Sequence, residues 1–186
     1  MEEDSVDCVI TDPPYSGFEG MESAKAYCDW FAEHFVEMQR VCRAQERIVV
    51  SQPQPRIDLF RKRFNFQSTI TLNNAMQDER GDDACFLCQT ETSPQSLPAI
   101  VQWPADIVPA SAHPNDRNIG KMGVVVKAMS NVGDIVLDPF CGSAAIGVAC
   151  ILLGRKYIGI ELMEDRAEDA RKRIEAAHAV IAERTV

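Results

Sequence analysis

The amino-acid sequence predicts an α/β protein with a doubly wound, Rossmann-like parallel sheet. The strongest observation is the last third of the chain, where strand-like and helix-like segments alternate twice. Two parallel strands joined by a helix are the half-unit of such a sheet. A second observation is the composition, because 46% hydrophobic and 25% charged residues over a length of 186 are typical of one globular domain.

The first third of the chain contains two strands and two helices in alternation. Residues 6–11 form an apolar run that stops at Pro13 and Pro14, because proline donates no hydrogen bond to a neighbouring strand. Apolar residues then recur every three or four positions from 27 to 41, which predicts a helix with one buried face. Residues 47–51 are predicted to be a buried strand, and residues 57–64 a short basic helix.

The remaining elements follow from similar patterns. Strands are predicted at residues 67–72, 85–90, 134–137 and 156–160, and helices at residues 143–153 and 167–181. Gly154 is expected to close the first of these helices. Residues 93–118 are rich in proline and have no clear period, which predicts a long loop.

The charge of the chain limits its partners. Nineteen Lys and Arg oppose 28 Asp and Glu, for a net charge of −9. Bulk positive charge therefore cannot hold this protein to nucleic acid or to an anionic membrane. Residues 40–64 nevertheless carry a net charge of +5, and Arg56, Arg61, Lys62 and Arg63 are candidates for contacts with DNA phosphates. An ordinary solvated helix face with ion pairs explains the same residues equally well.

The sequence predicts a cytoplasmic protein without a membrane segment. Its start, residues 1–4, is acidic and lacks the features of a secretory signal. No apolar stretch approaches the roughly 20 residues that a membrane helix needs. Seven cysteines without framework spacing indicate reduced thiols, and the pair Cys85 and Cys88 lacks the second pair of ligands that a zinc site requires. No metal site is predicted.

Two carboxylates mark a candidate ligand site in the last third of the chain. Asp138 ends a predicted strand, and Gly142 follows at the start of the next helix. Ligands of doubly wound folds lie at such strand ends, where glycine lets them approach the backbone. Glu161 ends the next strand and could accept hydrogen bonds from ribose hydroxyls. The alternatives are a turn capped by Asp138 and a solvated Glu161 at a helix start.

A second candidate site follows the first strand, at Asp12, Pro13, Pro14 and Tyr15. The two prolines fix the backbone and remove two donors. The amino group of a flipped base could donate to Asp12 and to the carbonyl of Pro13, while Tyr15 stacks on the ring. A tight turn after a strand is the alternative explanation.

Asp12-Pro13-Pro14-Tyr15 resembles the catalytic signature of the DNA amino-methyltransferases, which methylate adenine N6 or cytosine N4. Residues 138–143 resemble the S-adenosylmethionine motif of that family, and residues 154–162 the strand that follows it. The catalytic motif comes first, which is the circularly permuted order of the β-class. The resemblance therefore implies a permuted Rossmann-like methyltransferase sheet, and we expect it to be one strand short.

The resemblance also implies roles for individual residues. Asp12, Pro13, Pro14 and Tyr15 would form the catalytic site for the target amine. The cofactor S-adenosylmethionine would lie against Asp138, Phe140, Cys141, Gly142, Ser143, Glu161 and His113. Ala144 stands where the family usually has glycine, so we expect a narrower approach, no freedom to adopt a positive φ, and weaker cofactor binding.

The sequence thus predicts a single methyltransferase domain over residues 1–186. Residues 1–72 would be the catalytic half, residues 73–118 a reduced target-recognition region, and residues 119–186 the cofactor-binding half. The predicted activity is methylation of a DNA base amine, with adenine N6 preferred, as in restriction-modification enzymes. The alternatives are a non-catalytic binding subunit and methylation of a glutamine or RNA amine. The predicted partners are DNA and either a second copy or a separate targeting subunit.

Overall fold

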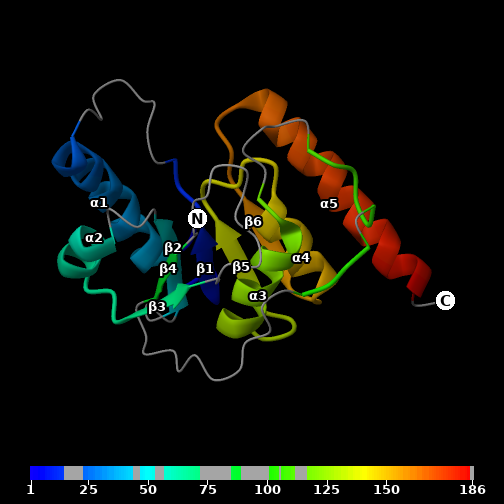
Figure 1. Ribbon diagram of the computed structural model, residues 1–186, viewed down its shortest axis with the longest axis horizontal. Helices are drawn as coiled ribbons and strands as arrows, with labels where there is room; N and C mark the ends of the chain where they lie inside the picture. The colour runs from blue at the N-terminus through cyan, green and yellow to red at the C-terminus, as the bar shows by residue number, and fades with distance from the viewer. Residues whose placement is uncertain are drawn as a thin grey trace. The chain divides into compact units, whose positions relative to one another are not determined.

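The computed structural model describes residues 1–14, 23–43, 47–52, 57–71, 85–88, 101–104, 106–111 and 117–184. The chain divides into two compact units, Met1–Gln95 and Ser96–Val186. The division falls inside the segment 73–118 that was expected to separate the two halves. Each unit is described by itself, with the labels of Figure 1.

The first unit contains a four-stranded part of a sheet in the order β3-β4-β2-β1. The strands are β1 (Cys8–Thr11), β2 (Ile48–Gln52), β3 (Ser68–Thr71) and β4 (Cys85–Cys88). β1 and β2 are parallel, and β4 runs antiparallel to both β2 and β3. Thr11 lies opposite Val50, so β1 and β2 end at the same edge. Both strands are buried along their whole length, which explains the apolar residues 8–10 and 48–50.

Two helices of the first unit pack through aromatic side chains. α1 (Ala24–Val41) begins at Ser23, whose hydroxyl accepts a hydrogen bond from the Ala26 N–H at 3.1 Å. α2 (Ile57–Phe64) lies beside it (Figure 1). The rings of Phe31 and Phe60 lie 5.1 Å apart, and those of Phe35 and Phe64 also lie 5.1 Å apart. This is the buried face that the three- and four-residue spacing predicted.

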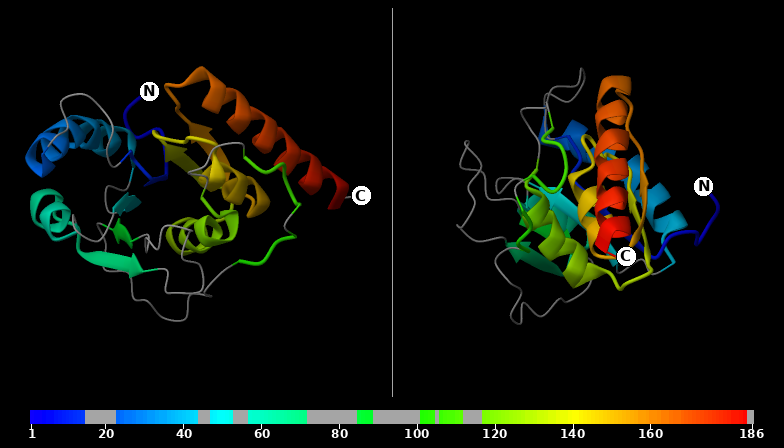
Figure 2. Two further views of the ribbon diagram at one scale, coloured as in Figure 1. Left: turned by 45° about the horizontal axis from the view of Figure 1, so that its top comes forward. Right: turned by 90° about the vertical axis from the view of Figure 1, so that its right-hand side faces the viewer.

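The second unit contains the parallel pair β5 (Ile135–Asp138) and β6 (Lys156–Gly159). The chain crosses between them through α4 (Ala145–Leu152). α4 contacts both α3 (Ile119–Met129) and α5 (Glu164–Arg184), as Figure 2 also shows. No strand follows β6 in the described part of this unit.

The predicted strands and helices are confirmed, with ends that differ by a few residues. The described residues between 101 and 118 form neither helix nor strand, as expected for the long loop. α3 was not predicted from the periodicity of the sequence.

Among the described residues, no helix is both long and apolar enough to cross a membrane.

Candidate functional site

Asp138 is the last residue of β5 and is only 1% exposed. Its Oδ1 accepts a hydrogen bond from the Phe140 N–H at 3.3 Å. Asp138 does not cap α4, whose N-cap is Ala144. Its bond to the Phe140 N–H does cap the turn after β5, so the alternative of a turn capped by Asp138 also has support. A carboxylate is costly to bury without polar partners. Asp138 lies at the carboxyl end of β5, the edge at which ligands of doubly wound sheets bind.

The turn between β5 and α4 contains two residues with positive φ. Gly142 has φ +51°, and a Cβ built on it would meet no atom within 4 Å. This open space lets a ligand approach the backbone. Ala144 has φ +59° and ψ 40°, so the expectation that alanine excludes this conformation is wrong. The conformation costs a non-glycine residue about 1–2 kcal/mol. Ala144 is fully buried, so its methyl group does not face solvent, and the expectation that it narrows the approach of the cofactor has no support.

Glu161 connects this turn to the end of β6. Its Oε2 accepts a hydrogen bond from the Gly142 N–H and its Oε1 one from the Met163 N–H, both at 2.9 Å. The interpretation of Glu161 as a merely solvated residue is therefore wrong. Each carboxylate oxygen has a second lone pair, so Glu161 can also accept from a ligand hydroxyl.

Two residues behind the turn were not singled out by the sequence. A Cβ at Gly147 would lie 2.4 Å from Tyr157 Cε1, and one at Gly159 would lie 2.8 Å from the Tyr157 hydroxyl. The two glycines therefore make room for the tyrosine ring, and they are the signal that could have identified it. Arg173 of α5 is the second residue, since its Nη1 donates to the Ser143 carbonyl oxygen at 2.7 Å.

Cys141 lies in the same turn, beside Tyr157. Its Sγ would be 3.0 Å from a Cβ at Gly159. Burial, helped by the negative charge of Asp138, raises the pKa of Cys141 to about 12. Burial also raises the pKa of Tyr157 well above its ordinary value. Both groups are neutral near pH 7, so Cys141 forms part of the wall of the turn and is no nucleophile.

In the first unit, the predicted base site lies at the carboxyl end of β1. Asp12 directly follows this strand and is half-buried, while Pro13 is buried and Pro14 half-buried. The last residue of the adjacent β2 is Gln52, which is fully buried and donates through Nε2 to the Tyr27 hydroxyl at 3.3 Å. Tyr15 lies outside the described residues, as does His113 of the second unit.

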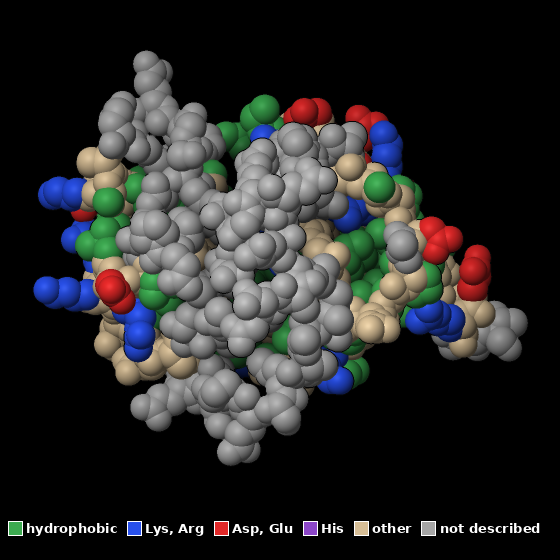
Figure 3. All heavy atoms as spheres, in the orientation of Figure 1, with side chains coloured by type: hydrophobic (Ala, Val, Ile, Leu, Met, Phe, Trp, Pro, Cys, Tyr) green, Lys and Arg blue, Asp and Glu red, His purple; other side chains and the backbone are tan. Residues whose placement is uncertain are grey.

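The basic residues of α2 are exposed. Lys and Arg side chains gather in this part of the surface, at the left of Figure 3. Arg63 forms an ion pair with Asp29 at 2.6 Å, and Arg61 donates to the Gln67 carbonyl oxygen at 3.3 Å. The exposure of Arg61, Lys62 and Arg63 is compatible with contacts to DNA phosphates. The ion pair of Arg63 supports the alternative of a solvated helix face. Arg56 lies outside the described residues.

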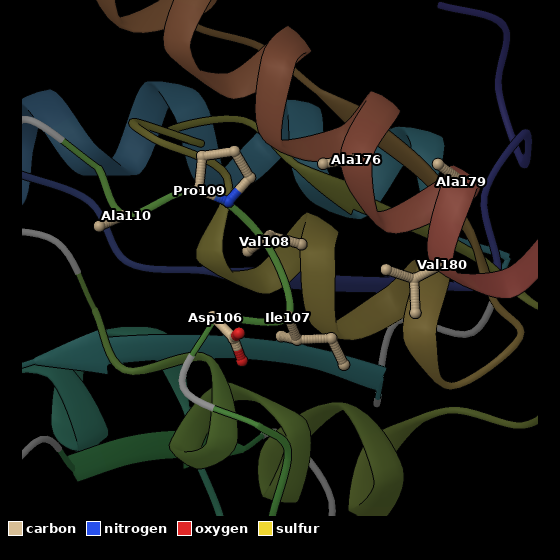
Figure 4. Close-up of a pocket in the computed structure, with 8 residues that line it drawn as sticks. All are labelled: Asp106, Ile107, Val108, Pro109, Ala110, Ala176, Ala179 and Val180. Atoms are coloured by element: carbon tan, nitrogen blue, oxygen red, sulfur yellow. The ribbon is translucent and has the colours of Figure 1, made fainter.

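A separate recess of about 590 Å³ lies along α5 in the second unit. Figure 4 shows the lining residues, which come from the loop 106–110 and from α5. They are Asp106, Ile107, Val108, Pro109, Ala110, Ala176, Ala179 and Val180. None of the predicted cofactor residues lines it, so this recess is not the predicted site. In the described part of the chain, no cluster of His, Cys, Asp and Glu is suited to a metal ion.

Solved DNA methyltransferases have a similar fold. The structure of M1.HpyAVI in complex with SAM matches with a TM-score of 0.65 and 20% identity, over 91% of this chain and 89% of its own. The PvuII DNA methyltransferase, which is cytosine-N4-specific, matches with a TM-score of 0.67 and 16% identity, over 96% and 85%. These likenesses confirm the predicted Rossmann-like methyltransferase fold.

Sequence comparisons also find similarities to methylases. Residues 89–172 match the N6_N4_Mtase family, described as DNA methylase. YubD of Escherichia coli K12, a methylase by name, is 28% identical over 92% of this chain and 83% of its own length. YhdJ of the same strain, named a DNA adenine methyltransferase, is 39% identical over 71 residues, which are 38% of this chain and only 24% of YhdJ. The chain is thus similar to DNA methylases over residues 89–172 and to a protein named as a methylase over most of its length.

Proposed function

We propose that this protein transfers a methyl group from S-adenosylmethionine to an exocyclic amino group of a DNA base. One coincidence carries the proposal: Asp12-Pro13-Pro14-Tyr15 occurs in a chain whose residues 89–172 match the DNA methylase family. Adenine N6 is the proposed target, from the Asp-Pro-Pro-Tyr form and the name of YhdJ. Cytosine N4 is the alternative, supported by the likeness to the PvuII enzyme.

The turn after β5 fits S-adenosylmethionine. We assign the methionine part of the cofactor to Asp138, Phe140, Cys141, Gly142 and Ser143, because the turn combines a buried carboxylate with open space at Gly142. Glu161 would accept the ribose hydroxyls, using the lone pairs left beside its two backbone bonds. His113 remains a proposed contact. When bound, the cofactor supplies a methyl group on a positively charged sulfur.

The residues after β1 would orient the acceptor. The Asp12 carboxylate and the Pro13 carbonyl accept the two hydrogens of the amine, which aims its lone pair at the methyl group. Tyr15 stacks on the base and holds it out of the duplex. Asp12 also stabilises the positive charge that develops on the amine nitrogen, so no covalent enzyme intermediate is required.

The decisive experiment incubates the purified chain with radiolabelled S-adenosylmethionine and unmethylated genomic DNA. The wild type should label the DNA, and Asp12→Ala should lose most of the transfer while cofactor affinity, measured by calorimetry, stays within about twofold. Asp165→Ala, an exposed residue of α5, is the matched control and should be fully active. Equal loss of cofactor binding and transfer in Asp12→Ala would show that Asp12 is structural.

A non-catalytic binding subunit is the second candidate. Ala144 in a strained left-handed conformation and the net charge of −9 favour it. This candidate predicts that the wild type binds S-adenosylmethionine and DNA but labels no DNA at any enzyme concentration.

The proposal includes a cellular location and partners. We propose a cytoplasmic protein, because seven cysteines without framework spacing indicate reduced thiols. DNA is the proposed substrate. A second copy or a separate targeting subunit is the proposed protein partner.

A further inference from the structure

Arg173 occupies a core position of α5. It is 1% exposed and lies on the buried stripe that also contains Ala170 and Ala177. Arginine is almost never fully buried unless its guanidinium is paired. The helix therefore places a cation where an apolar residue would be the ordinary choice.

One hydrogen-bond partner of Arg173 lies in the turn assigned above to the cofactor. Arg173 Nη1 donates to the Ser143 carbonyl oxygen at 2.7 Å, across 30 residues of sequence. The preceding residue, Gly142, donates its N–H to Glu161 at 2.9 Å. Two adjacent residues of one turn are thus held by charged side chains of opposite sign, one from α5 and one from the end of β6.

The conformation of this turn requires such support. Gly142 and Ala144 both have positive φ, and the latter conformation is unfavourable for alanine. Residues with sparsely populated backbone angles persist only where the surrounding structure holds them. A hydrogen bond from a charged donor is roughly twice as strong as a neutral one. The bond from Arg173 to Ser143, the residue between these two, is well placed to provide that support.

We propose that Arg173 is a positioning residue, which holds the turn 142–144 in the conformation that binds S-adenosylmethionine. The proposal rests on the proposed function for the identity of the ligand. Arg173 acts through the Ser143 carbonyl and is not assigned a contact with the cofactor.

Arg173→Met and Arg173→Lys test the proposal in the full-length chain. Methionine keeps much of the length of the side chain without any donor, whereas lysine keeps the charge and one donor group. Arg171→Met is the matched control, because Arg171 is on the same helix, has a side chain that is 62% exposed, and forms an ion pair with the exposed Glu164 at 3.0 Å. Thermal unfolding first establishes that each variant is folded at the assay temperature.

Calorimetry with S-adenosylmethionine is the main measurement. Arg173→Met should raise the Kd of the cofactor at least tenfold, Arg173→Lys by less, and Arg171→Met by no more than twofold. In the methylation assay, KM for DNA and kcat at saturating cofactor should stay near the wild-type values. A merely structural role would instead lower cofactor binding, DNA binding and kcat together.

Hydrogen exchange of the turn amides provides an independent readout. The Gly142 N–H donates to Glu161, and the Ala144 N–H donates to the Cys141 carbonyl oxygen at 2.8 Å. Both amides should exchange faster in Arg173→Met than in Arg171→Met. Unchanged exchange, or a cofactor Kd equal to that of Arg171→Met, would overturn the proposal.

The outcomes separate this inference from the proposed function. If the folded wild type does not bind S-adenosylmethionine, the proposed function fails, and the exchange of the turn amides decides the role of Arg173 alone. If Arg173→Met does not fold, Arg173→Lys decides, and a wild-type cofactor Kd and exchange rate in that variant would refute the proposal.

Discussion

Gly142 and Gly133 both have a positive φ, but only Gly142 lies in the proposed cofactor turn. Their φ values are +51° and +88°, and a Cβ on either would meet no atom within 4 Å. Gly133 lies in the turn before β5, whereas Gly142 lies in the proposed cofactor turn after it. The two positions therefore separate the backbone cost of a substitution from its effect on the ligand.

Gly142→Ala and Gly133→Ala should each lower the free energy of unfolding by about 1 kcal/mol. The left-handed conformation costs alanine about 1–2 kcal/mol, and the loss of unfolded-state entropy offsets about 0.4–1 kcal/mol of that cost. Urea denaturation measures this effect. Only Gly142→Ala should also raise the Kd of S-adenosylmethionine. A similar rise in Gly133→Ala would show that the open space at Gly142 is not the ligand site.

The thiol of Cys141 should be unreactive in the folded protein. Its pKa of about 12 lies above the ordinary value of 9.0, so the thiolate that alkylating reagents require is scarce at pH 8. Mass spectrometry after brief iodoacetamide treatment should find Cys141 unmodified in the native state and modified in urea. Between pH 9 and 12 the unfolded chain releases a proton that the folded chain keeps, so stability should fall with rising pH in this window. Rapid labelling of native Cys141 at pH 8 would contradict the assignment.

At the scale of single elements, α2 combines a buried aromatic face with an exposed basic one. Ile57, Phe60 and Phe64 are buried, while Arg61, Lys62 and Arg63 face solvent. Phosphate contacts from such a face attract DNA without selecting a sequence. The ion pair between Arg63 and Asp29 leaves the other two cations as the stronger candidates for those contacts.

Replacing Arg61, Lys62 and Arg63 together by Glu should weaken DNA binding to a similar extent for every sequence tested. The slope of log K against log salt should also become shallower, by about one for each phosphate contact that is lost. Fluorescence anisotropy with labelled duplexes at several salt concentrations measures both. Reversal of Arg171 and Lys172 on α5 is the control for the change in net charge. If this control weakens binding equally, the strip on α2 has no special role.

α3 shows why one element escaped prediction. It contains Gly120, Gly123 and three consecutive valines, all with poor helix propensity, and most of its residues are buried. A Cβ on Gly123 would lie 2.5 Å from the Trp103 ring, so the glycine makes room for that side chain. Packing therefore overrides propensity here. The available signal was Asn118, whose side chain caps the helix by accepting from the Lys121 N–H at 3.1 Å.

For the whole molecule, charge and length limit how this protein can select DNA. The net charge is −9, and residues outside the 40–64 segment carry −14. Base readout needs several side chains presented to a groove, and the 73–118 region is short for this purpose. We therefore expect DNA to be held by local phosphate contacts and chosen only coarsely.

The purified chain alone should methylate DNA weakly, at short or relaxed sequences, or should depend on a second subunit for targeting. Single-molecule sequencing of methylated genomic DNA maps the modified positions. The same assay with catalytically impaired Asp12→Ala provides the background. A long and strictly obeyed recognition site would contradict this expectation and would indicate that residues 93–118 read bases.

The positions of the motifs, and every described helix and strand except α3, could be predicted from local sequence patterns. These motifs include the prolines after β1, the apolar stripe of α1, and the carboxylates at the end of β5 and just after β6. They are local features, and their structural effects depend on near neighbours in the chain. The order of the two motifs can also be read directly from the sequence, and the resemblance to the amino-methyltransferases was based on it.

How the proposed cofactor turn is held became evident only from the tertiary structure. Glu161 receives the Gly142 N–H, Ala144 adopts a left-handed conformation, and Arg173 is buried against Ser143. Each of these features depends on contacts between residues far apart in the sequence. These contacts override the local conformational preferences that a sequence pattern expresses. An arginine in a helix predicts an exposed side chain, and only the packing of α5 against the turn makes its burial favourable.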